Sequence, residues 1–300
     1  MRTSILLVLT LLAACGEPPP APEPGRRPMI VVGIDGGEWK VIRDLWEQGR
    51  LPNFRRIAER GVTAELRTKY TASPIIWTTI ATGVTPAEHG ITGFVVPTAE
   101  GDVPVSSTVR KAPALWNMAS RAGRSVGVLG WWASWPAEPV SGIVVSDRAT
   151  LDLPDRVHPP EWLPRLSAAI ERARREGGAG DNPFGANPAA AERDRVVDLL
   201  ARELAAQRLD LLLVYFRGVD IASHHHFKHY RPQAFDPPPP DAEIAAHADA
   251  IPREYEAVDQ ALGAILAAAP EANLLVISDH GFKPARPEIV RVVLDLDELL

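Results

Sequence analysis

The sequence predicts an α/β fold in which a mostly parallel central sheet is flanked by helices. One observation is a series of short, continuous apolar runs, the pattern of parallel strands buried on both faces. A second is that segments with the apolar spacing of amphipathic helices lie between these runs, and such alternation is typical of α/β proteins. A third is size: 300 residues, 46% hydrophobic and 23% charged, are enough for one large domain with a substantial core.

The first part of this pattern begins at Met29, where the entirely apolar run MIVVGI predicts a buried strand. Gly61 and Gly83 each follow a helical pattern and are expected to end it. The expected elements are a strand at 29–34, helices at 38–48 and 51–60, a strand at 62–67 and a helix at 74–82.

The second part continues the alternation. The runs LDLLLVYF and ANLLVIS are the most apolar of its strands, and the long helix before LDLLLVYF carries an apolar stripe. The expected elements are a helix at 115–121, strands at 125–129 and 143–146, a helix at 189–207, a strand at 209–216, a helix at 254–267 and a strand at 272–278.

Two segments do not fit the alternation. Residues 150–190 contain several prolines and a charged helix, and residues 226–252 include the run Pro237–Pro240. Both are expected to be insertions over one edge of the sheet, where loops commonly carry specificity.

The N-terminus has the pattern of a secreted, lipid-anchored protein. Residues 1–14 contain one Arg and a short apolar run, as a signal peptide does, and the following Cys15 completes a sequence similar to a bacterial lipobox. Residues 15–28 are then expected to be the lipidated cysteine and a proline-rich tether. The expected location is the bacterial cell envelope, facing the periplasm or the outer surface. A plain secretory signal is the alternative.

Composition limits the classes of partner and site. The formal net charge is −6, so no basic excess favours nucleic-acid binding. The chain has a single cysteine, which excludes an intrachain disulfide and an all-cysteine metal site. Through the lipid anchor, a membrane is the partner expected here, and the oligomeric state is left open.

Acidic residues and histidines follow three of the predicted strands. Asp35 comes directly after the first strand, Asp220 and His224 follow LDLLLVYF, and Asp279 and His280 follow ANLLVIS. Because sites in parallel α/β sheets form at the carboxyl ends of strands, these residues predict one or two divalent-metal sites. The alternative is that each aspartate is a helix cap or turn residue and that the histidines are solvated.

A hydroxyl group also lies at the start of a predicted helix. Ser73 is expected to be the N-cap of the 74–82 helix, with Pro74 as its first residue. There the positive end of the helix dipole and the free backbone N–H groups would hold a phosphate, and coordination to a metal would favour the alkoxide form of the hydroxyl. The alternative is a purely structural cap.

The order of these motifs resembles that of the alkaline phosphatase superfamily. The likeness is greatest to its type I phosphodiesterase/nucleotide pyrophosphatase branch and covers residues 29–300. The run at 130–139 is similar to that of a bacterial subgroup. The motifs are Asp35, SPIIWTTIATG at 73–83, PAEHGI at 86–91, GWWASWPAEP at 130–139, Asp220-x-x-x-His224 and SDHGF at 278–282.

The resemblance implies two divalent cations, with Zn²⁺ expected and Mn²⁺ as the alternative. One would be held by Asp35, Asp279, His280 and the nucleophile oxygen. The other would be held by Asp220, His224 and a later histidine.

The resemblance also implies the reaction and a further partner, a phosphate-ester small-molecule substrate. The protein would hydrolyse phosphoric esters through a covalent phospho-enzyme formed on Ser73, with Thr71 or Thr78 as alternative nucleophiles. A phosphomonoester, phosphonate or sulfate ester hydrolase of the same fold is a related possibility, and the sequence leaves the natural substrate open.

The sequence departs from the family pattern near its end. The family's last metal-ligand histidine is expected well beyond the Asp-His-Gly motif, yet no histidine follows His280. The sequence is therefore expected to lack a C-terminal part, or the protein has lost a ligand. In the second case the chain would be an inactive, lipid-anchored envelope protein that binds a ligand or partner. Substitution of the missing ligand by His225, His226, His229 or His247 is a further alternative.

Overall fold

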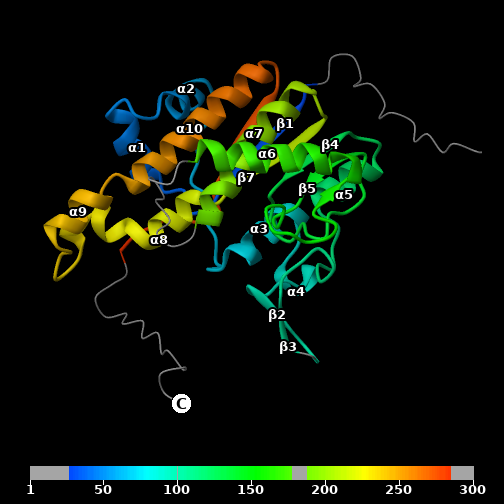
Figure 1. Cartoon of the computed structure of the whole chain (residues 1–300), viewed down its shortest axis with the longest axis horizontal. Coiled ribbons are helices and arrows are strands. Elements are labelled where there is room, and N and C mark those ends of the chain that lie inside the picture. Colours follow the sequence, from blue (N-terminus) through cyan, green and yellow to red (C-terminus); the bar gives the residue numbers. More distant parts are fainter. Residues whose placement is uncertain (1–26, 100, 178–187, 285–300) are drawn as a thin grey trace, which may run out of the picture.

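The computed structural model describes residues 27–99, 101–177 and 188–284 of the chain (Figure 1). The predicted signal peptide, the lipidation site Cys15 and most of the tether lie outside the described residues. Within the described ranges, no helix has the length and apolarity needed to cross a membrane.

A six-stranded sheet forms the centre of the molecule, in the order β6-β5-β4-β7-β1-β8. Neighbouring strands are parallel except β5 and β6, which pair antiparallel at one edge. The prediction of a mostly parallel sheet flanked by helices is therefore confirmed. The strands are β1 (Met29–Ile34), β4 (Val126–Leu129), β5 (Gly142–Val145), β6 (Val157–His158), β7 (Leu211–Phe216) and β8 (Asn273–Ile277).

Helices surround this sheet, and a separate hairpin of β2 (Val95–Thr98) and β3 (Gly101–Pro104) extends from one end of the molecule (Figure 1). The α-helices are α1 (Trp39–Glu47), α2 (Pro52–Arg60), α3 (Ser73–Thr82), α4 (Pro86–His89), α5 (Leu115–Arg121), α6 (Leu163–Glu176), α7 (Pro188–Ala206), α8 (Gly218–Tyr230), α9 (Asp241–His247) and α10 (Ala250–Ala268). Two short 3₁₀ helices are η1 (Pro160–Trp162) and η2 (Pro232–Ala234).

The strands are apolar on both sides because each face of the sheet is covered. Along β1, Ile30 and Val32 pack into a cluster with residues of α1, α2, α6, α7, α8 and α10, whereas Val31 packs into a second cluster with α3 and α5. Successive side chains of a strand point to opposite faces, so a strand between two helix layers must be apolar at every position. This explains the continuous runs in the sequence.

The expected strand at residues 62–67 is wrong. This segment is irregular and exposed, with 97% of Val62 and 63% of Leu66 accessible to solvent. A strand needs a partner for its backbone groups, and both edges of β1 are already paired, with β7 and β8. The outer edge of β8 remains, but the segment does not pair with it in the described sheet.

The two segments outside the sequence alternation contain regular structure. In the described part of 150–190, β6 extends the sheet, and Leu166 and Ile170 of α6 belong to the buried core. Residues 226–252 contain the end of α8, then η2, α9 and the start of α10. In Figure 1, α9 lies at the opposite end of the molecule from β4 and β5.

Candidate metal centre and nucleophile

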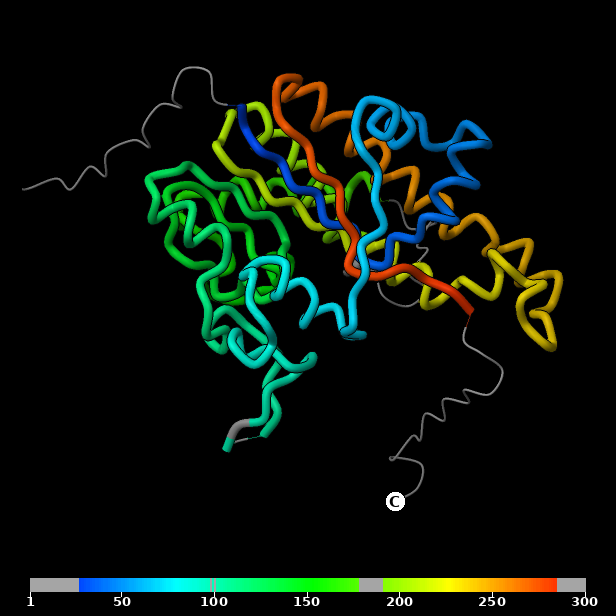
Figure 2. Tube along the Cα trace, turned by 180° about the vertical axis from the view of Figure 1, so that it is seen from behind, coloured from blue at the N-terminus to red at the C-terminus, as the bar shows by residue number. Residues whose placement is uncertain are grey.

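Three adjacent strands, β7, β1 and β8, place their carboxyl ends at one edge of the sheet, and Figure 2 shows these strands running side by side. The register aligns Val32 of β1 with Val214 of β7 and Val276 of β8. Residues that follow the three strands must therefore lie close together, which is the condition for a strand-end site.

Asp35, Asp279 and His280 form the centre of this site. Each offers a ligand atom, and these atoms all lie within 4.8 Å of one another. His280 Nε2 is 3.5 Å from Asp35 Oδ1 and 3.4 Å from Asp279 Oδ2. Both carboxylates are buried, so their charges are poorly solvated.

Ser73 joins the same group. Its Oγ donates a hydrogen bond of 3.1 Å to Asp35 Oδ1 and lies 3.2 Å from His280 Nε2. Helix α3 begins at Ser73 itself and Ala72 is its N-cap, so the prediction that Ser73 is the N-cap is wrong by one residue. The hydroxyl does not cap the helix, because it is turned towards Asp35.

A close helix–strand contact holds Ser73 in this place. A Cβ atom on Gly33 of β1 would lie 2.7 Å from the ring of Trp77 in α3. Glycine at this position therefore lets the Trp77 ring, and α3 with it, approach β1 closely. Trp131 Nε1 also donates to the Trp77 carbonyl, at 3.2 Å, which helps to hold α3 in place.

The two alternative nucleophiles lie elsewhere. Thr71 is exposed before α3, and Thr78 is buried inside it with no hydrogen-bond partner for its Oγ1 among the described residues. Of the three hydroxyl groups, Ser73 Oγ is the one seen to contact Asp35 and His280.

Asp220 and His224 lie one turn apart on α8, with His224 Nε2 3.4 Å from Asp220 Oδ1. Asp220 Oδ1 is 3.9 Å from His280 Nε2, so this pair adjoins the central group. Gly36 has a positive φ of 68°, and a Cβ on it would be 3.0 Å from Asp220. Glycine is thus required where the loop after β1 meets α8. All five predicted metal ligands are brought to one place.

The site concentrates negative charge in a buried environment. Burial, and then the Asp220 charge, raises the pKa of Asp35, while burial and Asp35 raise the pKa of Asp279. The pKa of His280 is also raised: burial lowers it, but the Asp279 carboxylate, the Gly281 carbonyl and Asp35 together outweigh burial. A bound cation would stabilise the ionised carboxylates that burial disfavours.

The residues present fit a divalent cation. Asp279 Oδ2 and Asp220 Oδ1 are buried and accept no hydrogen bond from any described residue. Buried carboxylate oxygens without a donor are costly unless a cation supplies the missing interaction. Carboxylate oxygen and imidazole nitrogen are ligands that suit both zinc and manganese.

Sequence reasoning missed Tyr215, which donates a hydrogen bond to Asp35 Oδ2. The Tyr215 hydroxyl in turn accepts a hydrogen bond of 2.7 Å from Trp132 Nε1. Burial, and then the Asp35 charge, raises the pKa of Tyr215 well above its usual value, so the phenol stays protonated as a donor. The available signal was a phenol at the penultimate position of the otherwise apolar run LLLVYF.

Asp194 was also missed. From α7, its Oδ2 accepts hydrogen bonds from the backbone N–H groups of Arg217, at 2.8 Å, and Gly218, at 2.6 Å. Arg217 is the N-cap and Gly218 the first residue of α8, the helix that carries Asp220 and His224. A carboxylate from another helix therefore caps α8 and helps to place its two candidate ligands.

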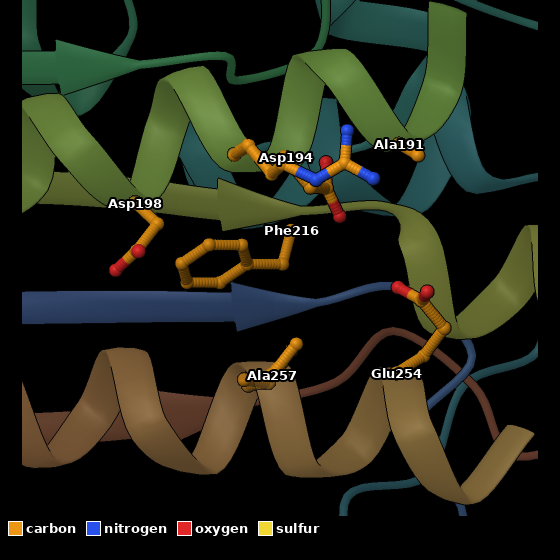
Figure 3. A pocket seen from close by; sticks show the side chains of 8 residues that line it. Ala191, Asp194, Asp198, Phe216, Glu254 and Ala257 are labelled. Atoms are coloured by element: carbon orange, nitrogen blue, oxygen red, sulfur yellow. The ribbon is translucent and has the colours of Figure 1, made fainter. Parts of the chain in front are cut away.

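The structure also contains a pocket of about 100 Å³ that Asp194 lines together with Phe216, Glu254 and other residues of α7 and α10, none of them a predicted metal ligand. Figure 3 shows the Phe216 ring between the carboxylates of Asp198 and Glu254, with α7 above and α10 below. Burial, and then the charge of Asp194, raises the pKa of Glu254 to about 8. The pocket lacks the convergent histidine and hydroxyl groups of the strand-end site, so we place the chemistry at the strand ends.

The fold and these side chains define an α/β protein with a candidate divalent-cation site and a buried hydroxyl at the carboxyl edge of its sheet. The sequence profile described as type I phosphodiesterase / nucleotide pyrophosphatase matches residues 29–300. The chain therefore belongs to this family, and the family prediction from the motifs is confirmed. Among curated proteins, no sequence matches the chain significantly.

Solved structures of phosphonoacetate hydrolase from Sinorhizobium meliloti 1021 share the fold. The complex with phosphonoformate is 20% identical, with a TM-score of 0.57, over 86% of this chain and 57% of that one. The complex with phosphonoacetate is 20% identical, with a TM-score of 0.58, over 88% and 58%. The chain thus spans somewhat under three fifths of the length of these enzymes.

Proposed function

We propose that the protein is a metal-dependent hydrolase of phosphoric esters, of the phosphodiesterase or nucleotide pyrophosphatase type. The observation that carries this proposal is the position of Ser73 Oγ, within hydrogen-bond distance of both Asp35 and His280. A buried hydroxyl beside carboxylates with raised pKa values has no evident structural need, whereas a nucleophile does need such neighbours.

Asp35, Asp279 and His280 would hold one divalent cation, and Asp220 and His224 would supply two ligands to a second. Zinc suits these ligands, and manganese is the alternative. When bound, such cations favour the ionised form of a neighbouring hydroxyl and neutralise phosphoryl oxygens.

Ser73 would act as the nucleophile. Its Oγ would form a bond to phosphorus while the bond between phosphorus and the leaving oxygen breaks, and the leaving group would take up a proton. Water would then cleave the Ser73–phosphate bond and restore the hydroxyl. The positive end of the α3 dipole stabilises the ionised form of Ser73, because this residue opens the helix.

A phosphonate is the second candidate substrate. The solved structures that share the fold are complexes of phosphonoacetate hydrolase with phosphonoformate and phosphonoacetate. We also propose that Cys15 is lipidated and that the enzyme is held at the bacterial cell envelope, as its N-terminal sequence predicts.

The test is Ser73→Ala in the full-length protein. We expect hydrolysis of bis-p-nitrophenyl phosphate to fall roughly 10³-fold or more, since removing a nucleophile abolishes the covalent route. Zinc content should change little, because Asp35, Asp279 and His280 remain. Thr71→Ala and Thr78→Ala are the matched controls and should keep most of the activity.

Full activity in Ser73→Ala would contradict the assignment of the nucleophile. Phosphate release from phosphonoacetate, without diester hydrolysis, would favour the second substrate. If the parent protein hydrolyses neither compound with zinc or manganese supplied, the enzymatic proposal fails and an inactive binding protein is favoured.

A further inference from the structure

A group of histidines lies on helix α8, away from the site described above. Asp220 and His224 occupy one face of this helix, and His226 comes two residues after His224. Because each residue turns an α-helix by about 100°, His226 points to roughly the opposite side from His224. His229 follows three residues later and therefore shares the face of His226.

These two imidazoles are almost fully buried, at 7% and 4% exposure for His226 and His229. Their Nδ1 atoms are 3.3 Å apart. Zinc binds imidazole nitrogen at about 2.0–2.1 Å with tetrahedral angles, so two of its ligand atoms lie roughly 3.3–3.4 Å apart. The observed separation of the two nitrogens matches that spacing.

Glu243 on α9 orients the second of these rings. Its Oε2 lies 3.2 Å from His229 Nε2, on the side of the ring away from His226. A carboxylate that accepts a hydrogen bond from the outer ring nitrogen is the usual partner of a zinc-bound histidine, because it leaves the lone pair on the inner nitrogen. With Nε2 protonated towards Glu243, the lone pair of His229 Nδ1 faces His226 Nδ1, and a cation between the two nitrogens would replace the hydrogen-bond contact that joins them.

A third imidazole completes the group. His247, the last residue of α9, has its ring centre 4.9 Å from that of His226 and 5.1 Å from that of His229. Its side chain is exposed, so a turn of the ring meets little steric resistance. Two nitrogens are already at ligand spacing, and rotation of His247 would supply the third.

We propose that His226, His229 and His247 form an accessory zinc site, separate from the strand-end ligands and joining α8 to α9. Three imidazole ligands with water in the fourth position are a known zinc arrangement, and imidazole favours zinc and other late transition ions. Nothing in the proposed reaction requires this site. Its expected effect is to fix α9 against α8.

The experiment is zinc titration of the full-length protein after removal of metal by a chelator. We expect the parent to bind one zinc ion per chain more than His247→Gln, and Glu243→Gln to weaken that ion's binding roughly 10–100-fold. Both substituted residues are exposed, so these variants should fold. His225→Gln, an exposed histidine of the same helix, is the matched control and should bind zinc as the parent does.

Cobalt provides a second measurement. Tetrahedral Co²⁺ bound by imidazoles absorbs visible light, and this part of the spectrum should be reduced in His247→Gln and kept in His225→Gln. Unchanged zinc stoichiometry and affinity in both His247→Gln and Glu243→Gln would overturn the proposal. In that case His226, His229 and Glu243 are a hydrogen-bonded chain that stabilises α8 and α9 without metal.

Discussion

Asp35 is the residue on which most interactions of the strand-end site converge. Its Oδ1 accepts a hydrogen bond from Ser73 and lies 3.5 Å from His280 Nε2, and its Oδ2 accepts one from Tyr215. Each oxygen thus has a defined orientation before any cation binds. Tyr215 is a positioning residue in this arrangement, because it acts through Asp35 and touches neither Ser73 nor His280 by a hydrogen bond in the described structure.

Replacing Tyr215 by Phe tests this role. The Asp35 carboxylate would lose the donor that orients it, and we expect zinc affinity to fall about 10–100-fold, as it does when the outer partner of a ligand is removed. Diester hydrolysis at low zinc should fall with it and recover in part at high zinc. Zinc titration and activity at two zinc concentrations provide the measurement.

Tyr70→Phe is the matched control, because Tyr70 lies in the irregular segment before α3. Equal zinc affinity in Tyr215→Phe and the parent would show that Asp35 is oriented without the phenol.

Two helices have their N-termini capped by an aspartate of another helix. Asp194 caps α8 and so acts on the helix that carries Asp220 and His224. Asp259 of α10 does the same for α2, where its Oδ1 accepts hydrogen bonds from the N–H groups of Asn53, at 2.9 Å, and Phe54, at 2.8 Å. The two caps are alike in chemistry, but α2 contributes no candidate ligand.

This contrast predicts different outcomes for Asp194→Ala and Asp259→Ala. Each should lower the free energy of unfolding by about 1–3 kcal/mol, because buried backbone donors lose a charged acceptor. Asp194→Ala should also weaken zinc binding, whereas Asp259→Ala should leave it unchanged. Denaturant unfolding and zinc titration measure the two effects, and equal zinc affinity in both variants would remove Asp194 from the support of the site.

Across the whole molecule, buried carboxylates make stability depend on pH. Glu254 on α10 has its pKa raised from 4.5 to about 8 by burial and by Asp194, against the opposing charges of Arg195 and Arg253. The folded protein therefore keeps a proton on Glu254 at pH values where the unfolded chain has lost it. By linkage, the Glu254 contribution to the free energy of unfolding is full below about pH 4.5 and is lost as the pH rises to about 8.

Glu254→Gln should consequently flatten the decline in stability between pH 5 and pH 8. Thermal unfolding of the parent and the variant at several pH values checks this. Glu256→Gln is the control, since Glu256 lies on the same helix but pairs with Arg50 at 2.6 Å near the surface. Parallel stability profiles for the parent and Glu254→Gln would contradict the prediction.

The sequence by itself determined the fold class, the positions of the main strands along the chain and the family. Apolar runs identify buried strands because every position of such a strand faces a helix layer, as Val31 and Val32 do on opposite faces of β1. Asp35, Asp220 and Asp279 were predictable as neighbours for a topological reason, because the carboxyl ends of parallel strands meet at one edge.

Only the tertiary structure decided which residues outside these motifs contact the candidate ligands or the helix that carries them. Tyr215 lies in a strand and Asp194 in a distant helix, and only the packing of α7, α8 and the sheet brings them to Asp35 and to the start of α8. It also decided that residues 62–67 are not a strand, because this segment pairs with no strand of the described sheet. Local sequence specifies patterns along the chain, whereas contacts between distant residues depend on how the elements pack.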